Sequence, residues 1–481
     1  MRSVPVQLLV GLLLFCTVGR AQNYHAIEGS PFAGSIGIAN NPASILDAPY
    51  PWDLTILSAQ NANTTNAVTF HNLSLLSHED TAQYNWNNGN FRRYAAFNVN
   101  VHLLNLRLAI GRKQAIAFGA NLRGYGMAKS QAFNYNDSVK NMNQFFSING
   151  DNTTYNASMV TSTWLELFGT YSRTLMDDEN GRLNAGLTLK VTRGISGAFA
   201  QLENGSVTRT VSGDLTYYLL KAGSARYGYS SNYDRWHNYN STSTNLQNMV
   251  TDSRAGASVD FGVEYLVKSQ AIINYTDGDT YYDYDWKIGI SLLDVGANVY
   301  KYGTQSRTAS DPKSNISDSL LNLKFDNVST LAQFNDSLAT IVNSISSIPG
   351  TFRVWNPTRL VINIDRPLGD RYSVNANLSL NITGNNNGKQ LFAKDFSLLS
   401  LTPRWETKSL GAYLPIQVTT EGKVWIGGAF KAGPLLLGMH NWANVFSKNS
   451  MQNGGFYMAL VIRPGKGFLQ KEAKEYTCPK M

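Results

Sequence analysis

Residues 183–193 of this 481-residue chain read LNAGLTLKVTR, and apolar residues alternate with polar or small ones as far as residue 192. Residues 372–382 (YSVNANLSLNI) and 257–267 (ASVDFGVEYLV) show the same alternation. Because successive side chains of a β-strand point to opposite faces, each run predicts a strand with one apolar and one polar face. Runs of about ten residues have the length that a tilted strand needs to cross a bilayer.

The parity of each run predicts which side chains face lipid. We expect the odd-numbered residues of 183–193 and 257–267, and the even-numbered residues of 372–382, to lie on the outer face. A charge introduced at Leu187 should then destabilise the fold by about 2–4 kcal/mol near the bilayer midplane. A charge at Thr188, on the opposite face, should be tolerated.

Two further runs change parity partway along the strand. In residues 97–110 the switch follows Leu103, and in residues 286–299 it follows Leu292. One extra residue, a β-bulge, would keep the apolar set of each run on one face. The alternative is that each strand leaves the membrane at the switch.

The connections between runs are of two kinds. Short hairpin-like turns are predicted at residues 111–114, 177–181 and 367–370, and long loops at about 128–161, 222–254 and 301–356. Short turns at one end and long loops at the other are typical of outer-membrane barrels. We therefore predict an all-β fold, a single transmembrane antiparallel β-barrel of about 14 strands, within a range of 12–16. The turns would be periplasmic and the loops extracellular.

Aromatic residues near the ends of the runs support this fold, because Tyr and Trp gather at membrane interfaces. A soluble core would also accept them. The residues concerned are Tyr94, Trp164, Tyr171, Tyr265, Trp286, Tyr372, Trp405 and Trp425. A soluble β-sandwich is less suitable, because it would have to bury each apolar face against a second sheet and usually has shorter strands.

The composition points away from a helical or nucleic-acid-binding protein. Charged residues are 15% and hydrophobic residues 43% of the chain, with Asn, Ser, Thr, Gly and Tyr filling the remainder. The formal net charge is +8, but the basic residues are scattered. We interpret them as solvated loop and lumen residues, with lipopolysaccharide phosphate as the alternative partner and no nucleic acid.

The first 21 residues predict a cleaved signal peptide. Arg2 precedes a short apolar stretch, and the small residues Gly19 and Ala21 suit cleavage after Ala21. A lipoprotein cysteine at Cys16 is the less favoured alternative. Cys478 is then the only cysteine, which excludes an internal disulfide. We expect an outer-membrane protein with a barrel at residues 51–464 and a periplasmic tail at 465–481.

Motifs for catalysis or metal binding are absent from the sequence: no HExxH, GxSxG, Walker A loop or CxxC pair occurs. We predict no enzyme activity, no cofactor and no metal, although a site built from distant residues on the barrel rim stays open. Asp283 and Asp285 beside Tyr281, Tyr282 and Tyr284 suggest calcium or sugar binding, but an ordinary solvated loop is favoured.

Short motifs resemble known barrel families. Residues 34–37 (GSIG) and 40–44 (NNPAS) resemble the start of outer-membrane barrels related to the long-chain fatty-acid transporters. Residues 401–404 (LTPR), 413–416 (YLPI) and 433–438 (GPLLLG) resemble a Bacteroidetes-type barrel family of unknown function. Some members of that family continue into a peptidoglycan-binding domain, which these residues do not carry over.

The resemblance also implies a plug. In the fatty-acid transporter group the N-terminal segment fills the barrel, and its motif corresponds here to Asn40, Asn41, Pro42 and Ala43. Residues 22–50 lack a long alternating run and are rich in Gly, Ala and Pro. Irregular backbone at membrane depth must be surrounded by protein or water, so we predict a small hatch in the barrel mouth or lumen. A disordered or periplasmic arm is the alternative.

Charged residues of the polar parity should point into the lumen, where charges of both signs would pair because an unpaired charge is costly away from water. They are His102, Arg107, Arg123, Lys190, Arg193, Asp260, Glu264 and Lys287. The function expected is passage of small hydrophobic or amphipathic molecules across the outer membrane. The alternative is a structural barrel, either a surface scaffold or a secretion-system subunit, and an outer-membrane enzyme is a distant third. Expected partners are outer-membrane lipid, lipopolysaccharide, the barrel-assembly machinery and a small hydrophobic or amphipathic ligand.

Overall fold

The computed structural model describes residues 26–72, 74, 82–111, 113–150, 153–237, 239–251, 253–269, 282–369, 371–386, 390–442 and 448–464. The predicted signal peptide, the first residues of the predicted hatch, the predicted tail and Tyr281 lie outside the described residues.

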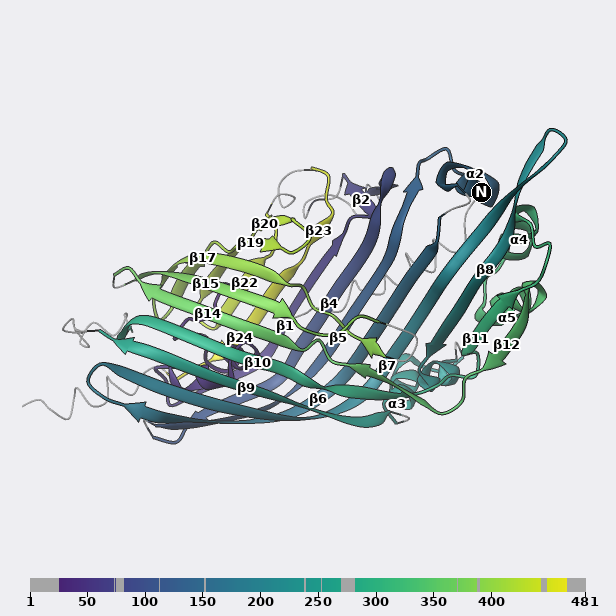
Figure 1. Cartoon of the computed structure of the whole chain (residues 1–481). Coiled ribbons are helices and arrows are strands. Elements are labelled where there is room, and N and C mark those ends of the chain that lie inside the picture. Colours follow the sequence, from purple (N-terminus) through teal and green to yellow (C-terminus); the bar gives the residue numbers. More distant parts are fainter. Residues whose placement is uncertain are drawn as a thin grey trace, which may run out of the picture.

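Fourteen antiparallel staves close into one barrel in the described part of the chain (Figure 1). Closure comes from β1, which pairs with β4 on one side and with the last strand, β24, on the other. Three staves are interrupted, each written here as two strands. The staves are β1 (Trp52–Thr65), β4 (Gly89–Ala109), β5 (Gln114–Tyr135), β6 (Tyr155–Asp177), β7 (Gly181–Ser212), β9 (Arg254–Lys268), β10 (Tyr284–Lys301), β13 with β14 (Thr351–Trp355, Arg359–Pro367), β15 (Tyr372–Asn381), β17 (Leu398–Glu406), β18 with β19 (Leu410–Tyr413, Ile416–Thr419), β20 with β21 (Val424–Ile426, Gly428–Ala432), β22 (Leu435–Met439) and β24 (Phe456–Ile462). The predicted count of about 14 is confirmed.

The outer face of the barrel is apolar, as the alternation predicts. Leu189 and Val191 are each 62% exposed, and Phe261, Ile290 and Tyr372 are also exposed. Soluble proteins rarely expose contiguous apolar patches larger than a few hundred Å², so this surface needs a membrane around it. Among the described residues, no helix has the length and hydropathy to cross a bilayer.

The aromatic prediction holds for some residues and is wrong for others. Tyr171, Trp286 and Tyr372 are exposed on the outer face. Trp164 and Trp425 are instead completely enclosed, with 0% and 1% exposure. Both occupy inward positions of their strands, where they pack against other aromatic rings rather than against lipid headgroups.

Both parity switches are β-bulges. The pairing of β4 with β5 shifts between His102 and Leu104. The pairing of β10 with β9 shifts between Leu292 and Val295. Neither strand ends there, so the first interpretation is confirmed. In β10 the bulge turns two successive residues, Leu293 and Asp294, into the interior.

The two ends of the barrel differ in architecture. At the short-turn end, β4–β5, β6–β7 and β14–β15 are joined by tight turns. At the long-loop end, β7 is 32 residues long and continues beyond the barrel, where it forms a hairpin with β8 (Leu215–Tyr229). Strand β8 pairs with β11 (Arg307–Pro312), and β11 pairs with β12 (Val342–Ser347). The regions predicted as loops are therefore structured.

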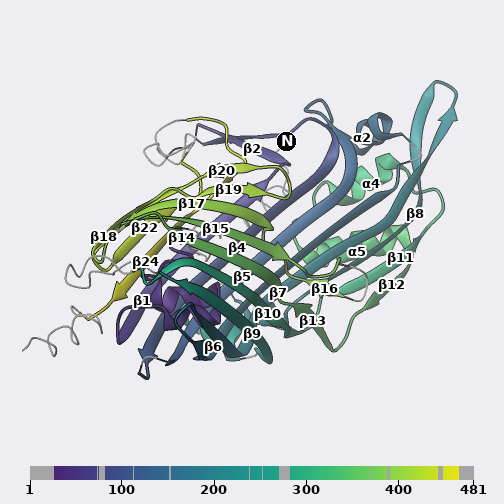
Figure 2. The ribbon, with the colours of Figure 1, turned by 60° about the vertical axis from the view of Figure 1, so that its left-hand side comes forward.

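Helices pack on this extension. They are α2 (Met142–Asn149), α4 (Asp318–Phe325) and α5 (Leu331–Ile341), and Figure 2 shows them gathered around β8, β11 and β12. Together they bury Phe146, Val207, Tyr218, Leu338 and Ile341 in a second hydrophobic core outside the barrel wall. The remaining elements are β2 (Val68–His71), β3 (Gln83–Trp86), β16 (Leu391–Phe392), β23 (Asn453–Gly454), η5 (Ser231–Arg235) and α3 (Thr242–Thr251).

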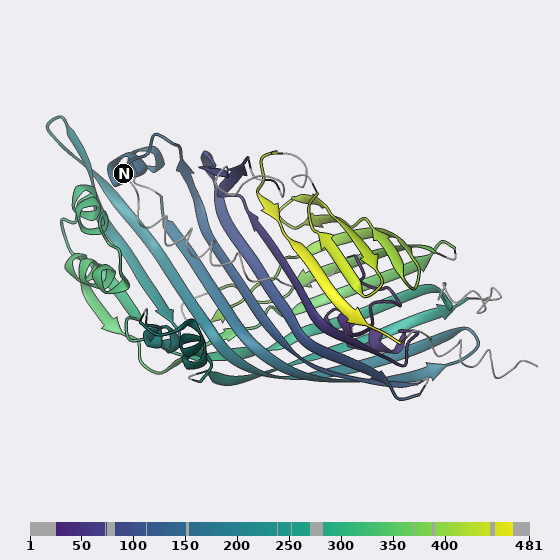
Figure 3. The ribbon, with the colours of Figure 1, turned by 180° about the vertical axis from the view of Figure 1, so that it is seen from behind.

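The N-terminal segment lies inside the barrel at the short-turn end (Figure 3). It contains the 3-10 helices η2 (Gly34–Ala39) and η3 (Pro42–Leu46). Ala26, Ala43 and Ile45 have no exposed surface, because the segment is enclosed by the barrel wall. We call residues 26–50 the hatch segment.

Candidate functional site: the lumen

The Asn-Pro-Ala motif of the hatch segment shapes its backbone and ties it to the wall. The Asn41 side chain caps η3, since its Oδ1 accepts from the Ala43 N–H at 2.9 Å. Its Nδ2 donates to the Val263 carbonyl of β9 at 3.0 Å. Pro42 takes the first helical position, where its missing N–H is not needed. The wall responds: Ser172 Oγ donates to the Pro42 carbonyl and Ser291 Oγ to the Asn40 carbonyl, at 2.7 and 2.6 Å.

Three glycines on neighbouring strands make room for this motif. A Cβ added to Gly262 would lie 2.0 Å from Asn41 Oδ1, and one added to Gly186 would lie 2.6 Å from the Ala43 nitrogen. At Gly289 it would lie 2.8 Å from Asn41 Nδ2. Gly186 and Gly262 face each other across β7 and β9. We call Gly186, Gly262 and Gly289 the glycine cradle, because any side chain there would displace the hatch segment.

Buried charges hold the rest of the hatch segment. Asp47 forms an ion pair with Lys287 of β10 at 3.1 Å. Arg107 of β4 donates to the Ile45 and Tyr50 carbonyls at 2.5 and 2.8 Å. At the opposite wall, Arg404 of β17 donates to the Glu28 carbonyl at 2.7 Å. The segment is thus fixed from several sides of the barrel.

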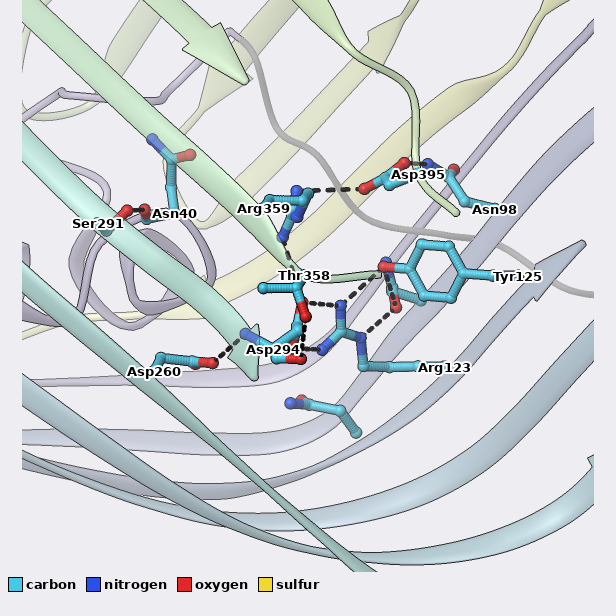
Figure 4. Close-up of polar contacts among 12 residues, drawn as sticks. Asn40, Asn98, Arg123, Tyr125, Asp260, Ser291, Asp294, Thr358, Arg359 and Asp395 are labelled. Carbon is cyan, nitrogen blue, oxygen red and sulfur yellow. Dashed lines mark hydrogen bonds and ion pairs between the residues drawn. The ribbon is translucent and has the colours of Figure 1, made fainter. Parts of the chain in front are cut away.

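Deeper in the lumen lies a layer of paired charges centred on Asp294 (Figure 4). The β10 bulge gives Asp294 a positive φ of 61° and aims its carboxylate inward. There it meets Arg123, Lys190 at 2.7 Å and Arg359 at 3.6 Å. Lys190 also pairs with Asp260 at 2.7 Å. One carboxylate therefore bridges cations from three strands.

Arg359 and Arg123 extend the layer across the lumen. Arg359 pairs with Asp395 at 3.2 Å, and Asn98 of β4 donates to the same carboxylate at 2.5 Å. Arg123 also donates to the Tyr125 hydroxyl at 2.7 Å. We define the charge layer as Arg123, Lys190, Asp260, Asp294, Arg359 and Asp395. All six are buried, so no space beside them is large enough to hold bulk water.

The structure buries seven of the eight side chains that the sequence predicts in the lumen. Arg123, Lys190 and Asp260 belong to the charge layer, whereas Arg107, Glu264 and Lys287 lie around the hatch segment. His102 lies at the β4 bulge, where its Nδ1 is 2.6 Å from the Asn105 amide nitrogen.

Arg193 is a correction. Its odd number gives it the parity of Leu187, Leu189 and Val191, which face outward, and its side chain is exposed. Its guanidinium donates to the Ser253 carbonyl at 3.3 Å. The prediction of a lumen position is wrong, because the strand alternation continues unbroken through Arg193.

Several functional residues escaped the sequence analysis. Asp294 sits at the parity switch of its run, so a bulge with an inward acidic residue was the available signal. Arg359 and Arg404 occupy polar positions of short runs that gave no clear parity. Asp395 lies in the connection after β15, where no alternation indicates direction.

An apolar cavity of about 360 Å³ opens at the long-loop end, between α2 and the extension of β7 and β8. Its lining includes Phe133, Phe145, Phe146, Val207, Leu220 and Leu338. A cavity of this size and polarity suits a small apolar or amphipathic ligand. The sequence analysis missed it, because its walls come from segments predicted to be loops.

Aromatic residues lie inside the barrel wall between the cavity and the charge layer. Tyr125 and Trp164 stack with ring centroids 5.5 Å apart, and Tyr300 and Phe352 stack at 5.2 Å. Phe199 of β7 contacts Phe352 at 5.4 Å. Tyr125 belongs to this cluster and also touches Arg123, so the aromatic and charged regions adjoin. No group of three or more potential metal ligands occurs among the residues that the structure describes.

The fold and the filled lumen define a class: a closed 14-stranded transmembrane barrel with an internal N-terminal hatch. Comparison with family models then places it. The chain belongs to the family of unknown function DUF5723, whose model matches residues 42–440. No curated protein matches the sequence.

Solved structures with a similar course of the chain include three transport barrels. The toluene transporter TbuX of Ralstonia pickettii is 11% identical, with 89% of this chain and 94% of that chain covered and a TM-score of 0.38. A deletion mutant of the monoaromatic hydrocarbon channel TodX is 12% identical, with coverages of 93% and 99% and a TM-score of 0.44. A Pseudomonas aeruginosa FadL homologue is 11% identical, with coverages of 93% and 100% and a TM-score of 0.38.

Proposed function

We propose that this protein lies in the outer membrane, takes up small hydrophobic or amphipathic molecules at its long-loop end and passes them into the barrel. The apolar cavity carries the proposal. It is lined by aromatic and aliphatic side chains on a part of the molecule that projects beyond the apolar belt of the barrel. An apolar solute leaving water would gain about 25 cal/mol for each Å² of apolar surface buried there.

The aromatic cluster is the next station along the lumen. Tyr125, Phe199 and Tyr300 come from β5, β7 and β10, so three separate parts of the wall line it. Beyond it the charge layer and the hatch segment fill the lumen. Passage therefore requires these two regions to rearrange while the barrel wall stays closed.

A cavity-filling variant tests the proposal. Ala225 lines the cavity, and Ala225→Trp should weaken the binding of a hydrophobic fluorescent probe such as N-phenylnaphthylamine by at least about tenfold, a loss of roughly 1.4 kcal/mol. The matched control is Leu323→Trp, because Leu323 is 75% exposed on α4 and does not line the cavity. Equal probe binding by Ala225→Trp and the wild type would contradict the proposal.

A structural barrel is the second candidate, favoured by the complete burial of the charge layer. Conductance separates the two candidates. Deleting residues 22–45 while keeping the signal peptide should raise single-channel conductance and antibiotic leakage if the hatch segment closes a transport path. Unchanged permeability in a folded deletion mutant would favour the scaffold.

A further inference from the structure

The segment between β8 and β9 lies on the outside of the barrel wall. An extra residue, Ile195, interrupts the β6–β7 pairing between Gly194 and Ser196 and reverses the parity of β7. As a result Ser196 points outward, and its Oγ shares a hydrogen bond of 2.5 Å with the Tyr233 hydroxyl of η5. Helix α3 follows on the same side of the wall, at the long-loop end of β7 (Figure 3).

Internal hydrogen bonds fix the shape of this segment. The Asn245 side chain of α3 accepts from the His237 N–H at 3.2 Å and donates to the His237 carbonyl at 2.9 Å. The Asn232 amide donates to the Met249 carbonyl. Asn232, Asn245 and Met249 are buried, so the segment presents one defined outer surface.

Apolar and aromatic side chains cover that outer surface. Leu246 and Val250 are four residues apart on α3 and are both exposed. Trp236 is exposed, and Tyr239 is 83% exposed while its ring stacks on His237 at 4.9 Å. Trp and Tyr beside a short apolar helix ridge are typical of segments that lie at a membrane–water interface.

Arginines accompany the apolar surface. Val191 is the last of the exposed apolar residues on this face of β7, and the next outward residue is Arg193. Arg254 begins the neighbouring strand, directly opposite Gly194. Arg235 ends η5, and all three arginine side chains are exposed. Asp234 adds little opposing charge, because its carboxylate accepts from the Tyr229 hydroxyl and the Thr304 N–H.

We propose that this surface binds the phosphorylated headgroup of an outer-leaflet glycolipid. We call it the collar and define it by Arg193, Arg235, Trp236, Tyr239, Leu246, Val250 and Arg254. Guanidinium groups bind phosphate through paired, charge-assisted hydrogen bonds. The exposed ridge of Leu246 and Val250 lies next to the lipid-facing belt of β7, where it would meet acyl chains. A membrane-bound phosphate therefore suits the collar better than a free anion. The proposal rests on the outer-membrane placement but not on transport.

Lipid retention by the purified full-length barrel tests the proposal. The barrel would be placed in phosphatidylcholine nanodiscs containing lipid A, and retained lipid A would be counted by native mass spectrometry. The test variant is Arg193→Gln with Arg235→Gln and Arg254→Gln. The control variant is Arg209→Gln with Arg353→Gln and Arg371→Gln, which removes three exposed arginines outside the collar.

The wild type and the control should retain lipid A, whereas the collar variant should retain it more weakly by about fivefold for each arginine removed. Dephosphorylated lipid A should not distinguish the three proteins, and inorganic pyrophosphate should not displace bound lipid A. Equal retention by the collar variant and the wild type would overturn the proposal. Displacement by inorganic pyrophosphate would overturn its commitment to a lipid. Neither readout depends on probe binding or conductance, so failure here leaves the transport proposal to its own tests.

Discussion

The two halves of the lumen are filled in opposite ways. At the short-turn end, the hatch segment and the charge layer are held by ion pairs such as Asp47–Lys287 and Lys190–Asp294. At the long-loop end, the extension of β7 and β8 encloses an apolar core with a cavity beside it. One half is closed by polar groups that are fully paired across strands, and the other holds unfilled apolar space.

This difference reflects the solvent on the outside of each half. The short-turn half is surrounded by lipid, so apolar side chains gain nothing from moving inward and the interior is left to polar residues. The long-loop extension stands in water, where the hydrophobic effect again drives apolar residues into a core. The position where Val191 gives way to Arg193 marks the change along β7.

The largest expected effect is in the charge layer. Asp294→Ala would leave Arg123, Lys190 and Arg359 without the carboxylate that they share. Removing one partner of a buried ion pair costs about 3–5 kcal/mol, so we expect a loss of this size in the free energy of unfolding. Denaturant unfolding in lipid vesicles measures it, with Asp326→Asn at an exposed position of the extension as the control. A loss below about 1 kcal/mol, the usual range for an exposed pair, would show that the layer does not hold the barrel together.

The lipid-facing surface should give the next effect. Leu187→Arg places a charge on the outer face of β7 and should cost about 2–4 kcal/mol near the bilayer midplane. The matched control is Leu323→Arg on α4, which is exposed outside the barrel wall and should change stability little. If both variants unfold at the same denaturant concentration as the wild type, the membrane boundary is misplaced.

Thr188 corrects the earlier expectation for the opposite face. It has no exposed surface, and its hydroxyl shares a hydrogen bond of 2.8 Å with that of Thr170. A charged side chain has no room there, so we no longer expect it to be tolerated. The polar parity of a strand in this barrel faces a packed interior rather than a water-filled pore.

Hatch docking should respond to substitution in the glycine cradle. Gly262→Val would drive its side chain into Asn41 and Pro42, at a cost of about 1–3 kcal/mol for overpacking. The cost is limited because the hatch segment can leave the lumen while the barrel stays intact. We therefore expect higher conductance and faster proteolysis of residues 26–50, with little change in barrel unfolding.

Gly169→Val is the matched control, because a Cβ at Gly169 meets no atom within 4 Å on the outer face of β6. It should leave both readouts unchanged. A Gly262→Val protein that conducts as the wild type does and protects the hatch segment from protease would show that the cradle is not needed for docking.

Alternation was enough to predict the barrel, its strand number and most inward-facing charges, because the pleat of a strand enforces a period of two. It failed where the pleat is interrupted or the chain leaves the membrane. The bulge in β10 was predicted, but not that Asp294 would become the centre of the charge layer. The cavity could not be predicted, because Phe145, Val207 and Leu338 meet only through pairings between distant segments.

The smallest expected effect separates binding from stability in the long-loop half. Phe145 lines the cavity, and its ring lies 5.6 Å from those of Phe133 and Tyr155. Phe145→Leu keeps the site apolar and should lower the free energy of unfolding by only about 1 kcal/mol, which is the usual scale for losing aromatic pairs. Hydrophobic probe binding should weaken measurably, because the cavity changes shape. Phe261→Leu is the control, since Phe261 is exposed on the lipid-facing side of β9 and should alter neither quantity. If Phe145→Leu instead destabilised the protein as much as Asp294→Ala, the long-loop half would be a structural core rather than a site with space for a ligand, and the contrast between the two halves would not hold.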